Sequence, residues 1–127
     1  MLFWGVLYHL RHPLLGLDCL RQLTGGEAYI ETAVADATLG SASGQPLARF
    51  HRRDELAGDS SNWFEPSVAA VAAWCGSAGL ETELLSTSPR RSKRPTRALF
   101  RAVPAAGDPE YRVLSYERPI RAVIAGP

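Results

Sequence analysis

Residues 2–34 read LFWGVLYHLRHPLLGLDCLRQLTGGEAYIETAV, and this opening sets the class of fold. The apolar run from Leu2 to Tyr8 has the length and the aromatic and β-branched residues of a strand, and Ala28–Val34 is a second such run. Between them, a helix can begin at Pro13 and end at Thr24-Gly25-Gly26. Its leucines recur at helical spacing, at positions 14, 17, 20 and 23. A strand, a helix and a strand within about 35 residues predict the βαβ unit of a parallel sheet.

The remaining residues predict one more helix among further strands. The helix is predicted over Pro66–Ala78, with Ser67 or Glu65 near its start and Gly79 as its stop. Strands are predicted over Leu80–Thr87 and Arg97–Val103, with two weaker candidates over Tyr111–Tyr116 and Ile120–Ala125. A flexible loop is predicted over Asp36–Gly44 and a long irregular segment over Phe50–Phe64. This order of elements indicates an α/β fold.

Composition points to an ordinary globular domain, or part of one. The chain has 127 residues, 46% hydrophobic and 21% charged, and its net charge of +1 provides no global basic field for nucleic acid. Cys19 and Cys75 lie among apolar residues and are expected to be buried and reduced, which suits a cytoplasmic protein. The apolar start is too short to cross a bilayer, which takes about 20 residues. Since it looks like a central strand, we expect that the chain has lost what came before it.

Several common catalytic motifs are absent from the sequence. Neither GxGxxG nor GxxxxGK[ST] occurs, and no GxSxG is present. The three histidines, His9, His12 and His51, have no cluster of carboxylates or thiols beside them, so no metal site is predicted. A basic run lies at Arg90, Arg91, Lys93, Arg94 and Arg97. This run fits either a solvated turn between strands or a patch that contacts phosphate.

Two segments carry more information about function. In residues 3–13, Gly5 permits close approach of a ligand, and Tyr8 and His9 would then supply a ring and a polar tip where the strand ends at a ligand crevice. The alternative is that Trp4 and Tyr8 are core aromatics. Residues 49–66 combine carboxylates, amides and aromatics, which suits a lid over a polar substrate. The alternative there is a loop held in place by two buried aromatics.

Three stretches, in this order and spacing, resemble one family. They are Gly5-Val-Leu-Tyr-His-Leu-Arg-His-Pro13, then Ile30-Glu31-Thr32, then Gly58-Asp-Ser-Ser-Asn62-Trp63-Phe-Glu-Pro66-Ser67. The chain is similar to the methyltransferases that include the bacterial tRNA uridine-34 carboxymethyltransferases and their uncharacterised relatives. The similarity runs from Leu2 to about Val103, and the first and third stretches are its most specific parts.

The resemblance implies a partial Rossmann-like sheet, strands four to seven of a class I methyltransferase, with flanking helices and an antiparallel last strand. Residues 1–103 would be the C-terminal half of that domain, and residues 104–127 a C-terminal extension or terminal strands. The fourth to seventh strands would be Leu2–Tyr8, Ala28–Val34, Leu80–Thr87 and a strand near Arg97–Val103. In the family, a glycine loop binds the cofactor and acidic residues hold its ribose and adenine. None of these has a counterpart in the chain.

The resemblance also implies site residues. Trp4 and Tyr8 would line the pocket of the cofactor and its transferred group, with Trp4 narrowing it relative to the tRNA enzymes. An arginine opening the last strand would contact the carboxylate of a carboxylated cofactor, and both Arg97 and Arg121 fit it, with Arg97 giving the shorter hairpin. The residues expected on the acceptor side are His9, Glu31, Asn62 and Trp63.

The implied activity is transfer of a methyl or carboxymethyl group from S-adenosylmethionine or a carboxylated derivative to a small-molecule or tRNA acceptor. We expect the chain to act only within a longer parent or an assembly, and to bind the cofactor weakly alone. An unpaired edge at the first strand predicts self-association. No membrane partner is expected. The alternatives are a non-catalytic α/β fragment and a small RNA-binding module that uses the basic run.

Overall fold

A mixed four-stranded sheet forms the centre of the computed structural model, which describes residues 1–89 and 94–106. The strand order is β1 (Leu2–Trp4), β2 (Ala28–Val34), β6 (Thr96–Pro104) and β5 (Leu80–Thr87). Strands β1 and β2 are parallel, and β6 lies antiparallel between β2 and β5. The βαβ unit predicted from the opening residues is therefore present, and the chain has an α/β fold.

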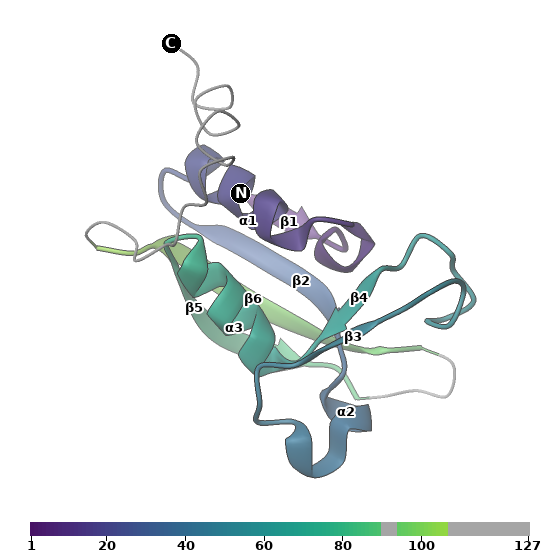
Figure 1. Cartoon of the computed structure of the whole chain (residues 1–127). Coiled ribbons are helices and arrows are strands. Elements are labelled where there is room, and N and C mark those ends of the chain that lie inside the picture. Colours follow the sequence, from purple (N-terminus) through teal and green to yellow (C-terminus); the bar gives the residue numbers. More distant parts are fainter. Residues whose placement is uncertain (90–93, 107–127) are drawn as a thin grey trace.

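The two long helices lie on the same face of this sheet (Figure 1). They are α1 (Pro13–Leu23) and α3 (Val68–Ser77). Alternate residues of β2 and β6, such as Ile30 and Phe100, pack against them in one core with Leu17 and Val71. The intervening residues project from the other face, where Leu2 and Trp4 are 72% and 58% exposed.

Helix α3 begins two residues after the predicted start at Pro66, and Ser67 rather than Glu65 caps it. The Ser67 hydroxyl accepts a hydrogen bond from the amide of Ala70 at 3.0 Å, which satisfies one free donor of the first turn. Gly79 ends the helix with a φ of 78°, a conformation that glycine adopts without strain. Cys75 is fully buried, and burial raises the pKa of its thiol to about 12, whereas Cys19 is only half-buried.

The first strand is shorter than the sequence predicted. Strand β1 ends at Trp4, and Leu7–His9 form a short 3₁₀ helix, η1. Gly5 donates to the carbonyl of Glu31 at 2.9 Å and turns the chain with a φ of 67°. The apolar run continues past β1 because η1 buries Leu7 completely in the core. Burial in a 3₁₀ turn, and not an extended backbone, therefore explains why this part of the sequence resembles a strand.

Two segments predicted as irregular contain regular structure. Residues 36–44, expected to be a loop, form α2 (Asp36–Leu39) and the 3₁₀ helix η2 (Gly40–Ala42). Asp36 accepts a hydrogen bond from the amide of Val68 at 2.8 Å, which holds this turn against α3. Strands β3 (Ala48–Phe50) and β4 (Phe64–Pro66) pair antiparallel and close the long loop at its base.

Strands β5 and β6 match the predicted segments, with β6 extending one residue beyond each end. The candidate strands over residues 111–116 and 120–125 lie outside the described residues, as do Arg121 and the basic residues Arg90, Arg91 and Lys93. Within residues 1–89 and 94–106, no helix is long and apolar enough to cross a membrane.

Candidate functional site

Tyr8, Glu31 and Arg97 meet where β1 ends, beside the middle of β2. The Arg97 Nε and Nη2 groups donate to the two carboxylate oxygens of Glu31, and Nη1 donates to the Tyr8 hydroxyl at 2.9 Å. The Arg97 guanidinium carbon lies 4.8 Å from the centre of the Tyr8 ring. Glu31 is only 7% exposed, and its hydrogen bonds raise the pKa of Arg97 further above its usual high value. Arg97 is therefore a fixed cation whose position two neighbours define.

Gly5 lies directly beside this cluster. A Cβ atom at Gly5 would lie 3.6 Å from Arg97 Nη2, 3.8 Å from the Tyr8 hydroxyl and 3.9 Å from a Glu31 carboxylate oxygen. The three side chains thus converge on the one position where the backbone carries no side chain. The backbone at Gly5 therefore approaches all three groups closely.

His9 connects the end of β1 to the long loop between β3 and β4. Its Nδ1 lies 2.9 Å from the Ser61 hydroxyl, which donates to Asp59 at 2.6 Å. These hydrogen bonds from Ser61 lower the pKa of the Asp59 carboxyl. The amide of Trp63 donates to the carbonyl of Tyr8 at 2.9 Å, so the loop is fixed to η1 at two points.

Asn62 and Trp63 hold the end of this loop. Asn62 is 4% exposed, and its amide group donates to the carbonyl of Leu56 at 2.8 Å, while its side-chain oxygen has no hydrogen-bond partner among the described residues. The Arg11 guanidinium lies 5.1 Å from the centre of the half-buried Trp63 ring. Both residues support the loop; no described contact joins them to Arg97.

Trp4 is opposite Glu31 in the β1–β2 ladder, so both side chains project from the face of the sheet that α1 and α3 do not cover. Of the residues that the sequence suggested, the structure thus joins Tyr8, Glu31 and Arg97 directly. It joins His9 and Trp63 to them through the backbone of η1.

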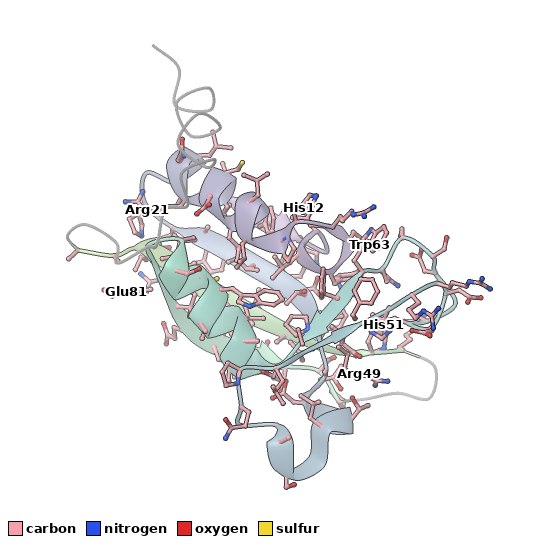
Figure 2. All side chains as sticks on the ribbon, viewed as in Figure 1. His12, Arg21, Arg49, His51, Trp63 and Glu81 are labelled. Carbon is pink, nitrogen blue, oxygen red and sulfur yellow. The ribbon has the colours of Figure 1, made fainter. Side chains whose placement is uncertain are left out.

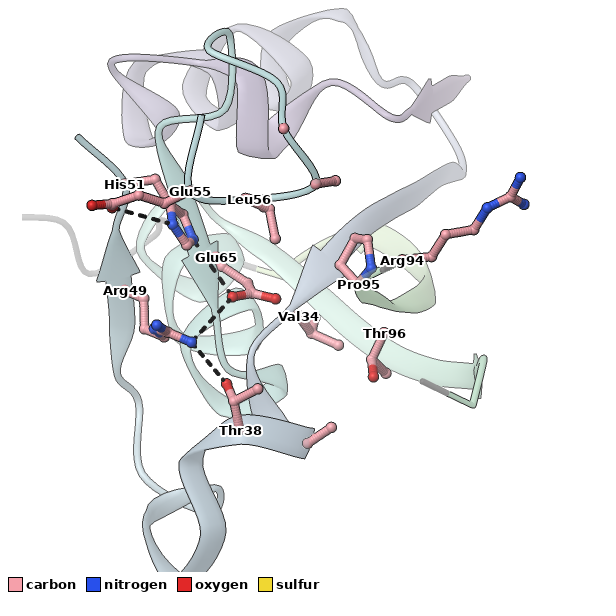
Figure 3. Close-up of a pocket in the computed structure, with 13 residues that line it drawn as sticks. Val34, Thr38, Arg49, His51, Glu55, Leu56, Glu65, Arg94, Pro95 and Thr96 are labelled. Atoms are coloured by element: carbon pink, nitrogen blue, oxygen red, sulfur yellow. Dashed lines mark hydrogen bonds and ion pairs between the residues drawn. The ribbon is translucent and has the colours of Figure 1, made fainter. Parts of the chain in front are cut away.

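A cavity of about 490 Å³ opens beside the end of β2 and the start of β6 (Figure 3), and residues 49–66, which the sequence suggested as a lid over a polar substrate, form part of its wall. His51, Glu65 and Thr96 line it, together with Arg49 and Arg94. Figure 2 shows Arg49, His51 and Trp63 at one end of the molecule, with Arg21 and Glu81 at the other. The only signal in the sequence was the density of polar and aromatic residues in residues 49–66. In the described part of the chain, no group of His, Cys, Asp and Glu could hold a metal ion.

Comparison with known proteins gives one consistent result. No protein-family model matches the chain. It is 35% identical to the tRNA U34 carboxymethyltransferase of Azotobacter vinelandii and 36% identical to that of Pseudomonas aeruginosa, in each case over 94% of its own length and 38% of the relative. It is 36% identical to the enzyme of that name from Dichelobacter nodosus over 68% of its length.

The two longest alignments cover more of the chain than Leu2–Val103, so they include part of the tail after β6. Arg121 lies outside the described residues, so the choice between Arg97 and Arg121 stays a prediction. The chain is thus similar to tRNA U34 carboxymethyltransferases over nearly all of its length, and spans about two fifths of theirs.

Proposed function

We propose that this chain is the C-terminal part of a class I methyltransferase domain of the tRNA U34 carboxymethyltransferase family. In this proposal it helps to transfer a methyl or carboxymethyl group from S-adenosylmethionine, or a carboxylated derivative, to a uridine of tRNA. The mixed sheet with its antiparallel β6 is consistent with strands four to seven of that fold. The curated relatives support the tRNA acceptor by their names.

The Tyr8–Glu31–Arg97 cluster is the observation that carries the proposal. It lies at the carboxyl end of β1, and ligands bind at the carboxyl ends of parallel strands in open α/β sheets. A guanidinium has five N–H donors, and Glu31 and Tyr8 use three of those on Arg97. The other two have no partner among the described residues and are available to a ligand beside Gly5.

These residues fit one end of the cofactor. When bound, S-adenosylmethionine supplies an electrophilic carbon on a sulfonium centre. The exposed ring of Trp4 attracts such a cation, whereas the Tyr8 ring already carries the Arg97 guanidinium, whose remaining N–H groups suit the carboxylate of a carboxylated derivative. Glu31 holds Arg97 in place and balances its charge. The sequence supplies no glycine loop for the nucleotide end, so that part of the pocket would come from another segment or chain.

In this proposal the residues of the chain act mainly by positioning. Holding the donor carbon and the acceptor in line provides a large part of the rate in a transfer between two bound molecules. Arg97 and Tyr8 orient the donor, whereas His9, Asn62 and Trp63 lie on the acceptor side and fix the loop there. Asn62→Ala is expected to lower turnover and leave cofactor affinity nearly unchanged.

Complementation tests the proposal. The purified chain is mixed with the segment of the Azotobacter vinelandii relative that it does not match and with bulk tRNA, and the donor is either methyl-labelled S-adenosylmethionine or its carboxylated derivative labelled at the same carbon. Label is expected in a uridine nucleoside, and mass spectrometry distinguishes methyl from carboxymethyl. Tyr8→Phe, which keeps the ring and removes the hydroxyl, is expected to reduce incorporation, whereas Tyr29→Phe serves as the matched control. If folded chain and segment leave every tRNA unlabelled, the chain is a non-catalytic fragment and the proposal is wrong.

A further inference from the structure

Asp59, Ser61 and His9 form a chain of hydrogen bonds that the proposed reaction uses only to hold a loop. Ser61 Oγ donates to an Asp59 carboxylate oxygen at 2.6 Å, and the Ser61 amide donates to the same oxygen at 2.8 Å. On the other side, His9 Nδ1 lies 2.9 Å from Ser61 Oγ and 3.2 Å from the Ser61 carbonyl oxygen. A carboxylate, a hydroxyl and an imidazole are thereby connected in that order.

The charge of Asp59 fixes the direction of these hydrogen bonds. The hydroxyl and the amide of Ser61 lower the pKa of the Asp59 carboxyl, so at neutral pH it is ionised and can only accept. The Ser61 hydroxyl has one proton, which Asp59 accepts, and so it offers His9 only its lone pairs. The Ser61 carbonyl oxygen is also an acceptor. The proton between His9 and Ser61 therefore belongs to His9 Nδ1.

This assignment leaves the other ring nitrogen of His9 as a base. A neutral imidazole carries a single N–H, so Nε2 holds a lone pair when Nδ1 holds the proton. No hydrogen bond to Nε2 is present in the described part of the chain. Asp59, behind Ser61, balances the positive charge that the ring acquires when Nε2 takes up a proton. A base oriented by a second polar group is a common arrangement in enzyme active sites.

His9 lies next to the Tyr8–Glu31–Arg97 cluster. The centres of the His9 and Tyr8 rings are 4.2 Å apart, and the Arg97 guanidinium carbon lies 4.8 Å from the centre of the Tyr8 ring. His9 is half-buried at the end of η1, and the hydrogen bond from the Trp63 amide to the Tyr8 carbonyl keeps the loop with Ser61 beside it. The base is therefore one side chain away from the residues that hold the donor in the proposed function.

The proposed reaction requires a base at this place. An oxygen or nitrogen acceptor that gains an alkyl group must give up its proton, and a neighbouring side chain that takes the proton lowers the barrier. Glu31 is not available, because both of its carboxylate oxygens accept from Arg97. The Tyr8 hydroxyl also accepts from Arg97. In the described part of this site, His9 is the neighbour that has a free lone pair on a basic nitrogen.

We propose that His9 is the general base of the transfer and that Ser61 and Asp59 are its positioning residues. The acceptor atom forms a bond to the transferred carbon as the carbon–sulfur bond of the donor breaks, and the electron pair of that bond stays on sulfur. The proton of the acceptor atom moves to His9 Nε2. This catalytic role rests on the proposed function, whereas the position of the proton on Nδ1 rests on the hydrogen bonds alone.

Heteronuclear NMR of the folded chain tests the proton position without donor or acceptor. At a pH where the rings are neutral, correlation of the ring nitrogens with the carbon-bound ring protons identifies the tautomer of each histidine. His9 is expected to be the Nδ1–H form, and Ser61→Ala is expected to shift it toward the Nε2–H form that a solvated imidazole favours. Ser60→Ala, at the exposed neighbour in the same loop, is the matched control and should leave the tautomer unchanged.

The complementation assay tests the catalytic role. His9→Ala is expected to lower kcat about 100-fold, the lower end for general-base catalysis, and to leave KM for the donor nearly unchanged. Added imidazole should restore part of the activity of His9→Ala, a recovery that the loss of a purely structural contact does not show. Ser61→Ala should lose less activity. His12→Ala is the matched control, because His12 is exposed at the start of α1 and its side chain makes no capping hydrogen bond (Figure 2).

An Nε2–H tautomer of His9 in the unaltered chain would overturn the proposal whatever the transfer assay gives. Transfer by His9→Ala at the rate of His12→Ala would also overturn it, as would a loss that imidazole does not restore, and both results leave the proposed function standing. If the Nδ1–H tautomer is found but no protein transfers label, the proposed function is wrong and the catalytic role of His9 falls with it.

Discussion

At the scale of single residues, the ion pair between Arg97 and Glu31 is the strongest local interaction in the candidate site. The Glu31 carboxylate is nearly buried, whereas 30% of the Arg97 side chain is exposed. Arg97→Ala leaves that carboxylate unpaired, and we expect a loss of about 3 kcal/mol in the free energy of unfolding, at the low end for a broken buried pair. Urea denaturation of the two proteins measures it.

Two further variants distinguish the loss of the Arg97–Glu31 ion pair from a general destabilisation of β6. Arg101→Ala removes another β6 arginine, whose contacts with Glu27 and Glu83 are exposed, and it should change stability little. Glu31→Gln combined with Arg97→Ala should recover part of the loss, because no unpaired charge remains. Equal losses for Arg97→Ala and Arg101→Ala would contradict the assignment.

Gly5 shows a second residue-scale effect, one of backbone conformation. A Cβ atom there would make only ordinary contacts, the closest at 3.6 Å, so space is available. The φ of 67° is unfavourable for any other L-residue, and Gly5→Ala should cost about 1 kcal/mol of stability. Thermal unfolding checks this against Gly26→Ala, where nothing lies within 4 Å and φ is not in the left-handed region. Similar results for both variants would show that the turn after β1 tolerates a side chain.

At the scale of elements, Ser67 joins α3 to the segment before β3. Its hydroxyl accepts from the amides of Ala70 and Leu47 and donates to the carbonyl of Gln45 at 2.6 Å. Ser67→Ala removes the helix cap and the hydrogen bonds to Leu47 and Gln45, so we expect a loss of about 1–2 kcal/mol. Ser77→Ala, at the exposed end of the same helix, is the control and should be close to neutral. Circular dichroism during denaturation measures both, and equal effects would exclude a special role for the cap.

At the scale of the whole molecule, the outer edge of β1 pairs with no other described strand. Leu2 and Trp4 expose apolar area beside that edge, a combination that favours pairing with another chain. We predict self-association at micromolar concentrations, measured by light scattering. Leu2→Lys should reduce it, whereas Leu23→Lys, at an equally exposed leucine on α1, should not. A clean monomer of the unaltered chain would contradict this prediction.

The proposed division of the cofactor pocket gives a second prediction at this scale. Only residues for the transferred group are present, so the chain alone should bind S-adenosylmethionine weakly or not at all. Isothermal titration calorimetry tests this directly. Micromolar affinity of the isolated chain would mean that these residues suffice for the nucleotide end as well.

The sequence by itself determined the elements whose signals are local. Pro13 and the spaced leucines predicted α1, the apolar run at Ala28–Val34 predicted β2, and Gly79 marked the end of α3, whose cap the sequence left open between Ser67 and Glu65. Helical and strand periodicity depend on neighbours a few residues apart, so these features can be recognised without knowing the fold. The same local logic failed at residues 5–8, where an apolar run met the core through a 3₁₀ turn.

Only the tertiary structure decided which distant residues meet. The resemblance indicated Tyr8, Glu31 and Arg97 as separate positions, but nothing local links Glu31 to an arginine 66 residues away. The placement of β6 beside β2 brings them together. The His51 cavity depends likewise on the pairing of β3 with β4 and on the start of β6. Strand order is set by packing of the whole sheet, and that information is spread over contacts that no short window of sequence contains.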